Sequence, residues 1–334
     1  MPARVRRHRP FSASGYCFLS KRYPSEQPTP EIQSLRGLTI DLMPQSANPI
    51  KLLNALPLTR RLLRRAAAHK GDSGKVLLIG GAPTMAGALV LAGRASLYSG
   101  AGYTVLMMLD AASAHIVPEQ PEMMVHAADR YDDPVQALAT IAPDVIAIGP
   151  GLGLDSVAQR WLQAALAWVG PLVIDADALT LLATHESLLD ALRLRPNACS
   201  LTPHPGEAAR LLGCSNHDVQ ADRPSALHAL VAHTHAIAVL KGQHSLVGAP
   251  GQEPQQCMDG NPGMAVGGMG DVLTGSMAAL AAQGLRHNLS LWEATCLAVQ
   301  VHAVAADRLV SQGVGPVGLT PMEVALEIRR VINS

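Results

Sequence analysis

A run of glycines stands directly before a single acid in the last third of the chain, in the segment DGNPGMAVGGMGDVLTG at 259–275. Glycine lets the backbone turn through positive φ and come close to a ligand. The apolar residues 272–280 predict a helix that begins near Gly270, and the free amides at such a start attract phosphate or a developing anionic oxygen. We therefore expect Gly268, Met269 and Gly270 to form an anion hole, with Asp271 as the base for a substrate hydroxyl.

An anion hole beside a carboxylate base suits phosphoryl transfer to an alcohol, because that reaction needs positioning and charge stabilisation more than covalent participation. The simpler alternative is that Asp271 only caps the helix, as Asp commonly does. Short glycine motifs often occur by chance, so the choice depends on what other segments bring to the same place.

Buried strands and helices alternate from Lys75 onwards, without an internal repeat. Strands are expected at 76–79, 103–108, 145–148, 172–174, 200–201, 236–240 and 245–247, and helices at about 87–99, 156–168, 207–212, 224–233, 271–282 and 291–311. The repeated βα order with continuous apolar strands predicts a single α/β domain with a doubly wound, mostly parallel sheet flanked by helices.

Polar segments follow the ends of five predicted strands. They are GG at 80–81, GPGLG at 149–153, DADAL at 175–179, TPHPGE at 202–207 and KG at 241–242. The carboxyl ends of parallel strands meet at one edge of a sheet, and ligands bind there. Turn formation explains the glycines and prolines but not the Asp, His, Glu and Lys that accompany them. We therefore expect these segments to line one cleft.

The composition excludes several classes of protein. Lys+Arg and Asp+Glu both number 26, so no global field attracts nucleic acid or an anionic membrane. Only 3% of the residues are aromatic against 48% hydrophobic, which favours small-residue helices packed on a parallel sheet. The five scattered cysteines lack metal-ligand spacing, and no apolar run approaches the roughly 20 residues of a membrane span. We expect a soluble, cytoplasmic protein.

The first 50 residues differ in composition from the rest of the chain. Arg4, Arg6, Arg7 and Arg9 precede the first acid at Glu26, a composition similar to a mitochondrial presequence. An irregular extension, or a start codon placed too far upstream, explains the same letters and is the favoured interpretation. We expect residues 1–56 to be irregular and residues 57–334 to form the domain.

Together these motifs resemble the ADP- or ATP-dependent NAD(P)H-hydrate dehydratase family, which has the ribokinase-like fold. The resemblance runs colinearly from about 58 to 332 and also includes KGDSG at 70–74, GA at 87–88, GAG at 100–102 and GNPG at 260–263. The TPHPGE segment discriminates best, because sugar and vitamin kinases of this fold share the Gly270-Asp271 pair but not this element. Two positions depart from the family pattern: Met269 and Ser245 stand where the family usually has Thr.

The resemblance implies a stand-alone hydro-lyase without the epimerase domain found in many bacterial versions. It would return the S-epimer of NADH or NADPH hydrate (NADHX or NADPHX) to NADH or NADPH, in the repair of nicotinamide nucleotides. ADP is the expected co-substrate, with ATP as the alternative, and AMP and phosphate are the expected products with ADP. Mg²⁺, a homotetramer and a functional link to a separate epimerase are also implied.

The family's site residues fall on matching positions of this sequence. The hydrate would be bound by Ala88, Gly153, His204 and Asp271, and the nucleotide by Lys241, Gly242, Gln243, His244, Ser245 and Gly270. Asp175 and Asp177 could hold magnesium through water, but Asp177 is equally a helix cap, and no metal ligand is assigned.

Two other functions stay open at this stage. A vitamin-alcohol kinase of the same fold would release a stable phosphorylated product, and the Gly270-Asp271 pair alone does not exclude it. A catalytically silent nucleotide-binding protein would need a broken site, and the intact Asp271 argues against that.

Overall fold

The computed structural model describes residues 50–115, 120–196 and 198–334. The expected irregular extension lies almost wholly outside these residues, except for 50–56. Leu53 and Ala55 are buried, and the Ala55 amide donates to Gln300 Oε1 at 2.6 Å. The expected boundary at 57 was therefore too late, because local sequence does not reveal contacts with a side chain about 245 residues away.

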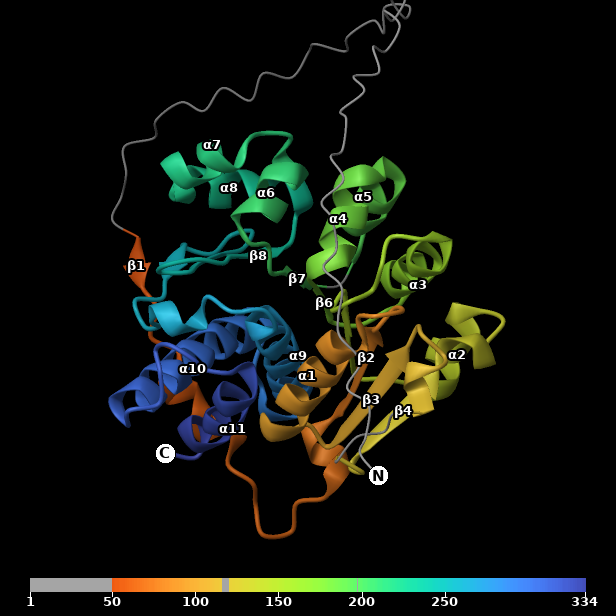
Figure 1. Ribbon diagram of the computed structural model, residues 1–334, viewed down its shortest axis with the longest axis horizontal. Coiled ribbons are helices and arrows are strands. Elements are labelled where there is room, and N and C mark those ends of the chain that lie inside the picture. Colours follow the sequence, from red (N-terminus) through yellow and green to blue (C-terminus); the bar gives the residue numbers. More distant parts are fainter. Residues whose placement is uncertain (1–49, 116–119, 197) are drawn as a thin grey trace, which may run out of the picture. The chain divides into compact units, whose positions relative to one another are not determined.

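The described strands form one mostly parallel sheet. They are β1 (Lys51–Leu52), β2 (Lys75–Gly80), β3 (Tyr103–Met108), β4 (Met123–Ala127), β5 (Val145–Ile148), β6 (Leu172–Ile174), β7 (Cys199–Leu201), β8 (Ile237–Leu240), β9 (Leu246–Gly248) and β10 (Gln255–Gln256). Their spatial order is β1-β10-β9-β8-β7-β6-β5-β2-β3-β4 (Figure 1). Only β9 runs antiparallel to its described neighbours, β8 and β10.

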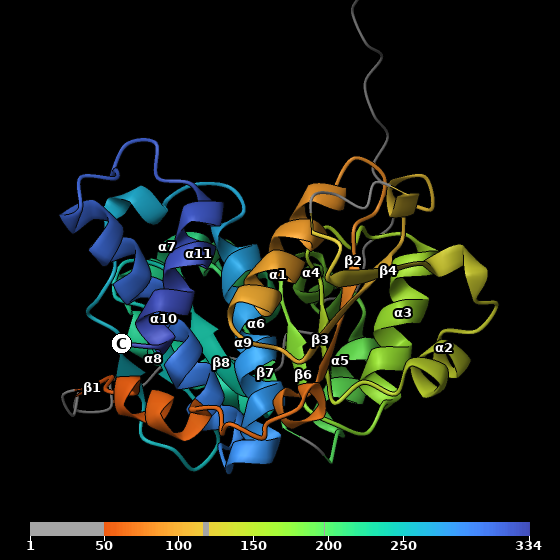
Figure 2. The same cartoon turned by 90° about the horizontal axis from the view of Figure 1, so that it is seen from below.

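Helices cover both faces of the sheet. They are α1 (Ala86–Tyr98), α2 (Pro134–Ile141), α3 (Ser156–Ala167), α4 (Ala176–Thr184), α5 (Glu186–Arg193), α6 (Pro205–Leu212), α7 (Asn216–Ala221), α8 (Arg223–Thr234), α9 (Met269–His287), α10 (Leu291–Ser311) and α11 (Pro321–Ile332). Figure 2 shows α1, α9, α10 and α11 together on one side.

The strands are apolar throughout because each face of the sheet has its own core. Leu78 and Val76 pack toward α1 and α9 in one cluster, while Leu77 and Ile79 pack toward α3 and α4 in the other. This arrangement is the reason that the strands read as continuous apolar runs. The doubly wound α/β domain predicted from the sequence is confirmed.

The strand order reverses between β5 and β2. From β2 the chain proceeds to β3 and β4 on one side, and from β5 to β6, β7 and β8 on the other. The loops that leave these two central strands are joined by backbone hydrogen bonds, from Gly81 N to Pro150 O at 3.1 Å and from Ala82 N to Gly151 O at 2.6 Å. Such a switch point is where a ligand cleft is expected in this kind of sheet.

Several elements were not predicted from the sequence. They are the edge strands β1 and β4, the strand β10 next to β1, and the helices α2, α4, α5, α7 and α11. The strands β1 and β10 are two residues long and α7 has six residues, so each is too short to show a periodic pattern in the sequence. No helix among the described residues is long and apolar enough to cross a membrane.

Candidate active site

Helix α9 starts at the carboxyl edge of the sheet, where the amide of Met269, one of the three predicted anion-hole residues, donates to Val266 O at 3.4 Å. It begins after Gly268, whose φ of +91° suits glycine, and no side chain caps it. Within the described residues, neither the Gly270 amide nor the Asp271 amide donates to a protein acceptor. The Lys241 ammonium also lies beside Gly270, because a Cβ at this position would be 3.3 Å from Lys241 Nζ. The predicted anion hole therefore has both free N–H groups and a cation beside it.

The Asp271 carboxylate makes no hydrogen bond or ion pair with any described residue. Burial, and after it the charge of Asp175, raises the pKa of Asp271 to about 7, although the Lys241 ammonium opposes the shift. An acid that only caps a helix accepts a hydrogen bond from a backbone amide, and Asp271 accepts none from the described residues. The capping alternative is therefore wrong, and the carboxyl has the properties of a general base near neutral pH.

A buried ionic junction lies next to Asp271. Lys241 Nζ donates to Asp175 Oδ1 at 2.8 Å, and Thr274 Oγ1 donates to Asp175 Oδ2 at 2.7 Å. Asp175 is 1% exposed and follows β6, Lys241 follows β8, and Thr274 lies on the second turn of α9. Burial works against the charge of Lys241, but the carboxylates of Asp175 and Glu207 outweigh it and raise its pKa. Lys241 is therefore a fixed cation at the helix start.

His204 begins α6 and closes the other side of the junction. Its Nδ1 accepts the amides of Gly206 and Glu207, at 3.0 and 3.3 Å. Burial, Lys241 and Arg210 lower the pKa of His204, so the ring is neutral at pH 7 with its proton on Nε2. The Nε2 atom lies 3.4 Å from Glu207 Oε1, and the His204 side chain is 51% exposed. His204 can thus donate a hydrogen bond to a ligand.

Glu207 has a role that the sequence interpretation missed. Its Oε2 accepts the His204 amide at 2.8 Å and lies 3.9 Å from Lys241 Nζ. Burial raises the pKa of Glu207 to about 7, against the effect of Lys241. Its spacing of three residues from His204 is that of a capping box, which is the sequence signal for it.

Gly153 lies on the loop after β5 at the switch point, and Ala88 lies just after the loop that leaves β2. Ala88 is in the first turn of α1, and its amide donates to Met85 O. A Cβ on Gly153 would lie 3.3 Å from the Ala82 side chain, and the Gly153 amide donates to Asp177 Oδ2 at 2.9 Å. Asp177 in turn acts electrostatically on Asp271. The structure therefore links three of the four expected hydrate-binding positions, Gly153, His204 and Asp271, through Asp177, Asp175 and Lys241.

The expected nucleotide segment borders a cavity of about 500 Å³. Gln243 and His244 line it together with Gln220, Arg223 and Pro224 from α7 and α8. Arg223 was not expected: its guanidinium donates to the Leu240 and Lys241 carbonyls and occupies the space that a side chain at position 242 would need. Nothing in the local sequence signals this contact.

The expected magnesium positions are engaged by the protein. Both Asp175 oxygens accept hydrogen bonds, and one Asp177 oxygen accepts the Gly153 amide. No group of three His, Cys, Asp or Glu suited to a metal occurs in the part of the chain that the structure describes. We assign neither acid as a metal ligand. Helix α4 begins after Asp175 and has no side-chain cap, so Asp177 does not cap its own helix but accepts the amide of Gly153 from another loop.

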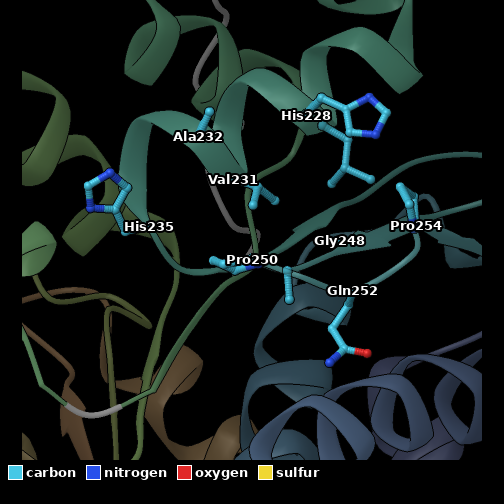
Figure 3. Close-up of a pocket in the computed structure, with 10 residues that line it drawn as sticks. His228, Val231, Ala232, His235, Gly248, Pro250, Gln252 and Pro254 are labelled. Carbon is cyan, nitrogen blue, oxygen red and sulfur yellow. The ribbon is translucent and has the colours of Figure 1, made fainter.

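A second cavity, of about 330 Å³, lies between α8 and the segment after β9. Figure 3 shows its lining, with His228, Val231 and Ala232 on α8 opposite Gly248 and Pro250. None of the predicted site residues lines it. The predicted site residues therefore lie elsewhere in the described part of the chain.

The match to known proteins covers most of the chain. The family model described as NAD(P)H-hydrate dehydratase matches residues 76–330. The chain is 39% identical over 273 residues to the bifunctional NAD(P)H-hydrate repair enzyme Nnr of Vibrio cholerae, covering 81% of this chain and 52% of that protein. The Escherichia coli enzyme of the same name is 38% identical, with 81% and 50% covered. The chain thus spans about half the length of these relatives.

Solved structures agree with this match. The ADP/ATP-dependent NAD(P)H-hydrate dehydratase of Bacillus subtilis, co-crystallised with ATP/Mg²⁺, superposes with a TM-score of 0.72 at 28% identity, covering 85% of this chain and 98% of that one. The hydroxyethylthiazole kinase of Pyrococcus horikoshii has a TM-score of 0.51 at 14% identity, with 84% and 91% covered, and so shares the fold alone. The predicted ribokinase-like fold is confirmed, and the chain belongs to the NAD(P)H-hydrate dehydratase family.

Proposed function

We propose that the protein uses an adenine nucleotide, with ADP as the expected donor, to dehydrate the S-epimer of NADH or NADPH hydrate. The products would be NADH or NADPH, AMP and phosphate. The observation that carries this proposal is the unpartnered Asp271 carboxyl, with a pKa of about 7, beside free amides and the Lys241 ammonium. Family membership and the ADP/ATP-dependent relative support the choice of substrates.

The first step would be phosphorylation of the ring hydroxyl. Hydroxide is a poor leaving group at neutral pH, and transfer of the terminal phosphoryl group of the nucleotide converts it into phosphate. Asp271 takes the hydroxyl proton as the oxygen attacks phosphorus. The Gly270 and Asp271 amides and Lys241 neutralise the charge on the transferring group.

The second step would be elimination. The lone pair of the ring nitrogen expels phosphate as the C6–O bond breaks, a proton leaves C5, and the C5=C6 double bond of the dihydronicotinamide forms. This step needs no oxidant, because the hydrate and the product differ by one water.

The two ligands would lie on opposite sides of Asp271. The hydrate would lie near Ala88, Gly153 and His204, where small residues leave room and the Nε2–H of His204 offers a donor. The nucleotide would lie along Lys241 to Ser245 and the cavity of about 500 Å³, with its phosphates directed toward Gly270. Magnesium would be held by phosphate oxygens and water, which is a common mode for this ion.

The experiment supplies the purified protein with NADPH hydrate, magnesium and either ADP or ATP, and follows the near-ultraviolet absorbance of reduced nicotinamide. Recovery with one nucleotide identifies both reaction and donor, and separated epimers identify the substrate stereochemistry. Asp271→Asn is the matched inactive control. No recovery with either nucleotide, in protein that binds nucleotide, would contradict the proposal and direct the search to alcohol kinase substrates, whose phosphorylated product is stable.

The homotetramer, the cytoplasmic location and the link to an epimerase stay predictions. Light scattering after size-exclusion chromatography tests the first, and a monomer would contradict it.

A further inference from the structure

Asp175 stands between the site lysine and the site helix. One of its oxygens holds Lys241 Nζ at 2.8 Å and the other accepts the Thr274 hydroxyl at 2.7 Å. A side chain that is 1% exposed and held at both oxygens has a single orientation. Its position therefore fixes where the ammonium lies.

Asp271 is one turn before Thr274 on the same helix, yet Lys241 makes no ion pair with it among the described residues. A lysine beside two carboxylates pairs with the one that is better placed. The junction with Asp175 and Thr274 keeps the ammonium on Asp175. A base that was itself paired with lysine would hold its charge more tightly and accept a proton less readily.

We propose that Asp175 is a positioning residue that draws Lys241 away from Asp271, so that one cation serves the transferring phosphoryl group while the Asp271 carboxyl stays unpaired and basic. This role rests on the proposed function of Asp271 as the base. It concerns a residue that makes contact through Lys241 and Thr274 and not with the reacting atoms.

Three charged groups among the described residues act on the pKa of Asp271. Asp175 and Asp177 raise its pKa and Lys241 lowers it, after burial as the largest cause. Lys241 also faces Glu207, and it lowers the pKa of the buried His302 on α10. Loss of the Asp175 charge removes one effect that raises the pKa of Asp271. It also releases Lys241, whose charge lowers that pKa. Both changes have the same sign.

The test is a carbon-13 titration of the aspartate carboxyl groups, with the Asp271 signal assigned by its absence in Asp271→Asn. In wild-type protein this signal should titrate near pH 7. In Asp175→Asn its midpoint should fall by at least about one pH unit. Thr274→Val is the matched comparison: it keeps every charge and removes only the hydrogen bond to Asp175, so the midpoint should fall less than in Asp175→Asn.

Enzyme kinetics give a second readout. The acid limb of kcat/KM against pH should move down in Asp175→Asn by the same amount as the titration midpoint, and kcat at pH 8 should fall about tenfold or more as the lysine leaves its place. Because the titration needs no turnover, a shifted midpoint in a protein inactive on the hydrate would contradict the proposed reaction and leave this inference standing.

A midpoint that does not fall in correctly folded Asp175→Asn overturns the inference. If circular dichroism shows that this variant does not fold, the Asp271 titration is measured in Lys241→Gln, where the midpoint should shift in the opposite direction. Removal of the cation should raise the Asp271 midpoint, and a midpoint that stays or falls overturns the inference equally.

Discussion

Helices α9 and α10 follow each other in the chain, and each has an acid at the third position of its first turn. The two acids differ in their hydrogen bonds and in the direction of their pKa shifts. Glu293 accepts the Ser290 amide at 2.8 Å, and the Ser290 hydroxyl accepts the Glu293 amide. Asp271 has no such partner, because Gly268 offers no side chain and no cap is formed. The pKa of Glu293 is lowered despite burial, through its bonds to Ser290 and Arg61, whereas that of Asp271 is raised to about 7.

The comparison teaches that the residue at the helix start decides what the acid can do. A capped start satisfies its own amides and stabilises the helix. An uncapped glycine start leaves the amides and the acid without protein partners, which costs stability but leaves both available to a ligand. We infer that the α10 start serves folding and the α9 start serves binding and proton transfer.

The largest expected difference is in activity. Asp271→Asn keeps the size of the side chain but removes the base, so kcat/KM for the proposed reaction should fall by about 10²–10⁴-fold. Glu293→Gln keeps its capping geometry and should leave kcat/KM unchanged. Both are measured by recovery of reduced nicotinamide absorbance. Equal losses in the two variants would remove the functional distinction between the two helix starts.

The next difference is in stability against pH. The pKa of Asp271 in the folded protein, about 7, lies above its ordinary value of 3.8. Its ionisation therefore lowers the free energy of unfolding: the effect is absent below pH 4, grows as pH rises, and is complete above pH 7. Asp271→Asn should therefore unfold less readily than wild type at pH 8, by about 2–4 kcal/mol, with the gap closing toward pH 4. Glu293→Gln should show the opposite sign at pH 8. Urea unfolding across this range checks both, and a pH-independent gap for Asp271→Asn would contradict its raised pKa.

The smallest expected effect is at the capped start. Ser290→Ala removes the hydroxyl that accepts the Glu293 amide, so the free energy of unfolding should fall by about 1 kcal/mol. Activity should be unchanged, because α10 contributes no amide at its start to the proposed cleft. A loss of turnover in folded Ser290→Ala would show that the α10 start also acts on the site.

The sequence predicted the parts of the site that depend on local rules. Glycines before Asp271 and an apolar run after it indicated a helix start, and the structure places the start at Met269, one residue from the expected Gly270. It also indicated that segments after the strands would meet at one edge, because parallel strands force that arrangement. The resemblance supplied His204, Gly153 and Lys241, and the structure links all three to the same cluster.

Other parts of the site follow from contacts between distant segments. The capping alternative for Asp271 could be dismissed only once its carboxylate was seen to accept no amide. The sequence left Asp175 as a residue that could hold magnesium through water, with no metal ligand assigned. Its pairing with Lys241 and Thr274 joins residues 66 and 99 positions apart. The contacts of Arg223 with the strand end and of residues 53–55 with Gln300 have no local sequence signal.

The sequence by itself determined the fold class, the position of the glycine start and the types of residue at the strand ends, because helix starts, apolar strands and turn residues are encoded within a few neighbours. Only the tertiary structure decided how the charges divide, with Lys241 on Asp175, Glu207 capping α6 and Asp271 unpaired. The physical reason is that ion pairing and burial depend on which side chains the sheet brings within a few ångströms, and sequence spacing does not contain those distances.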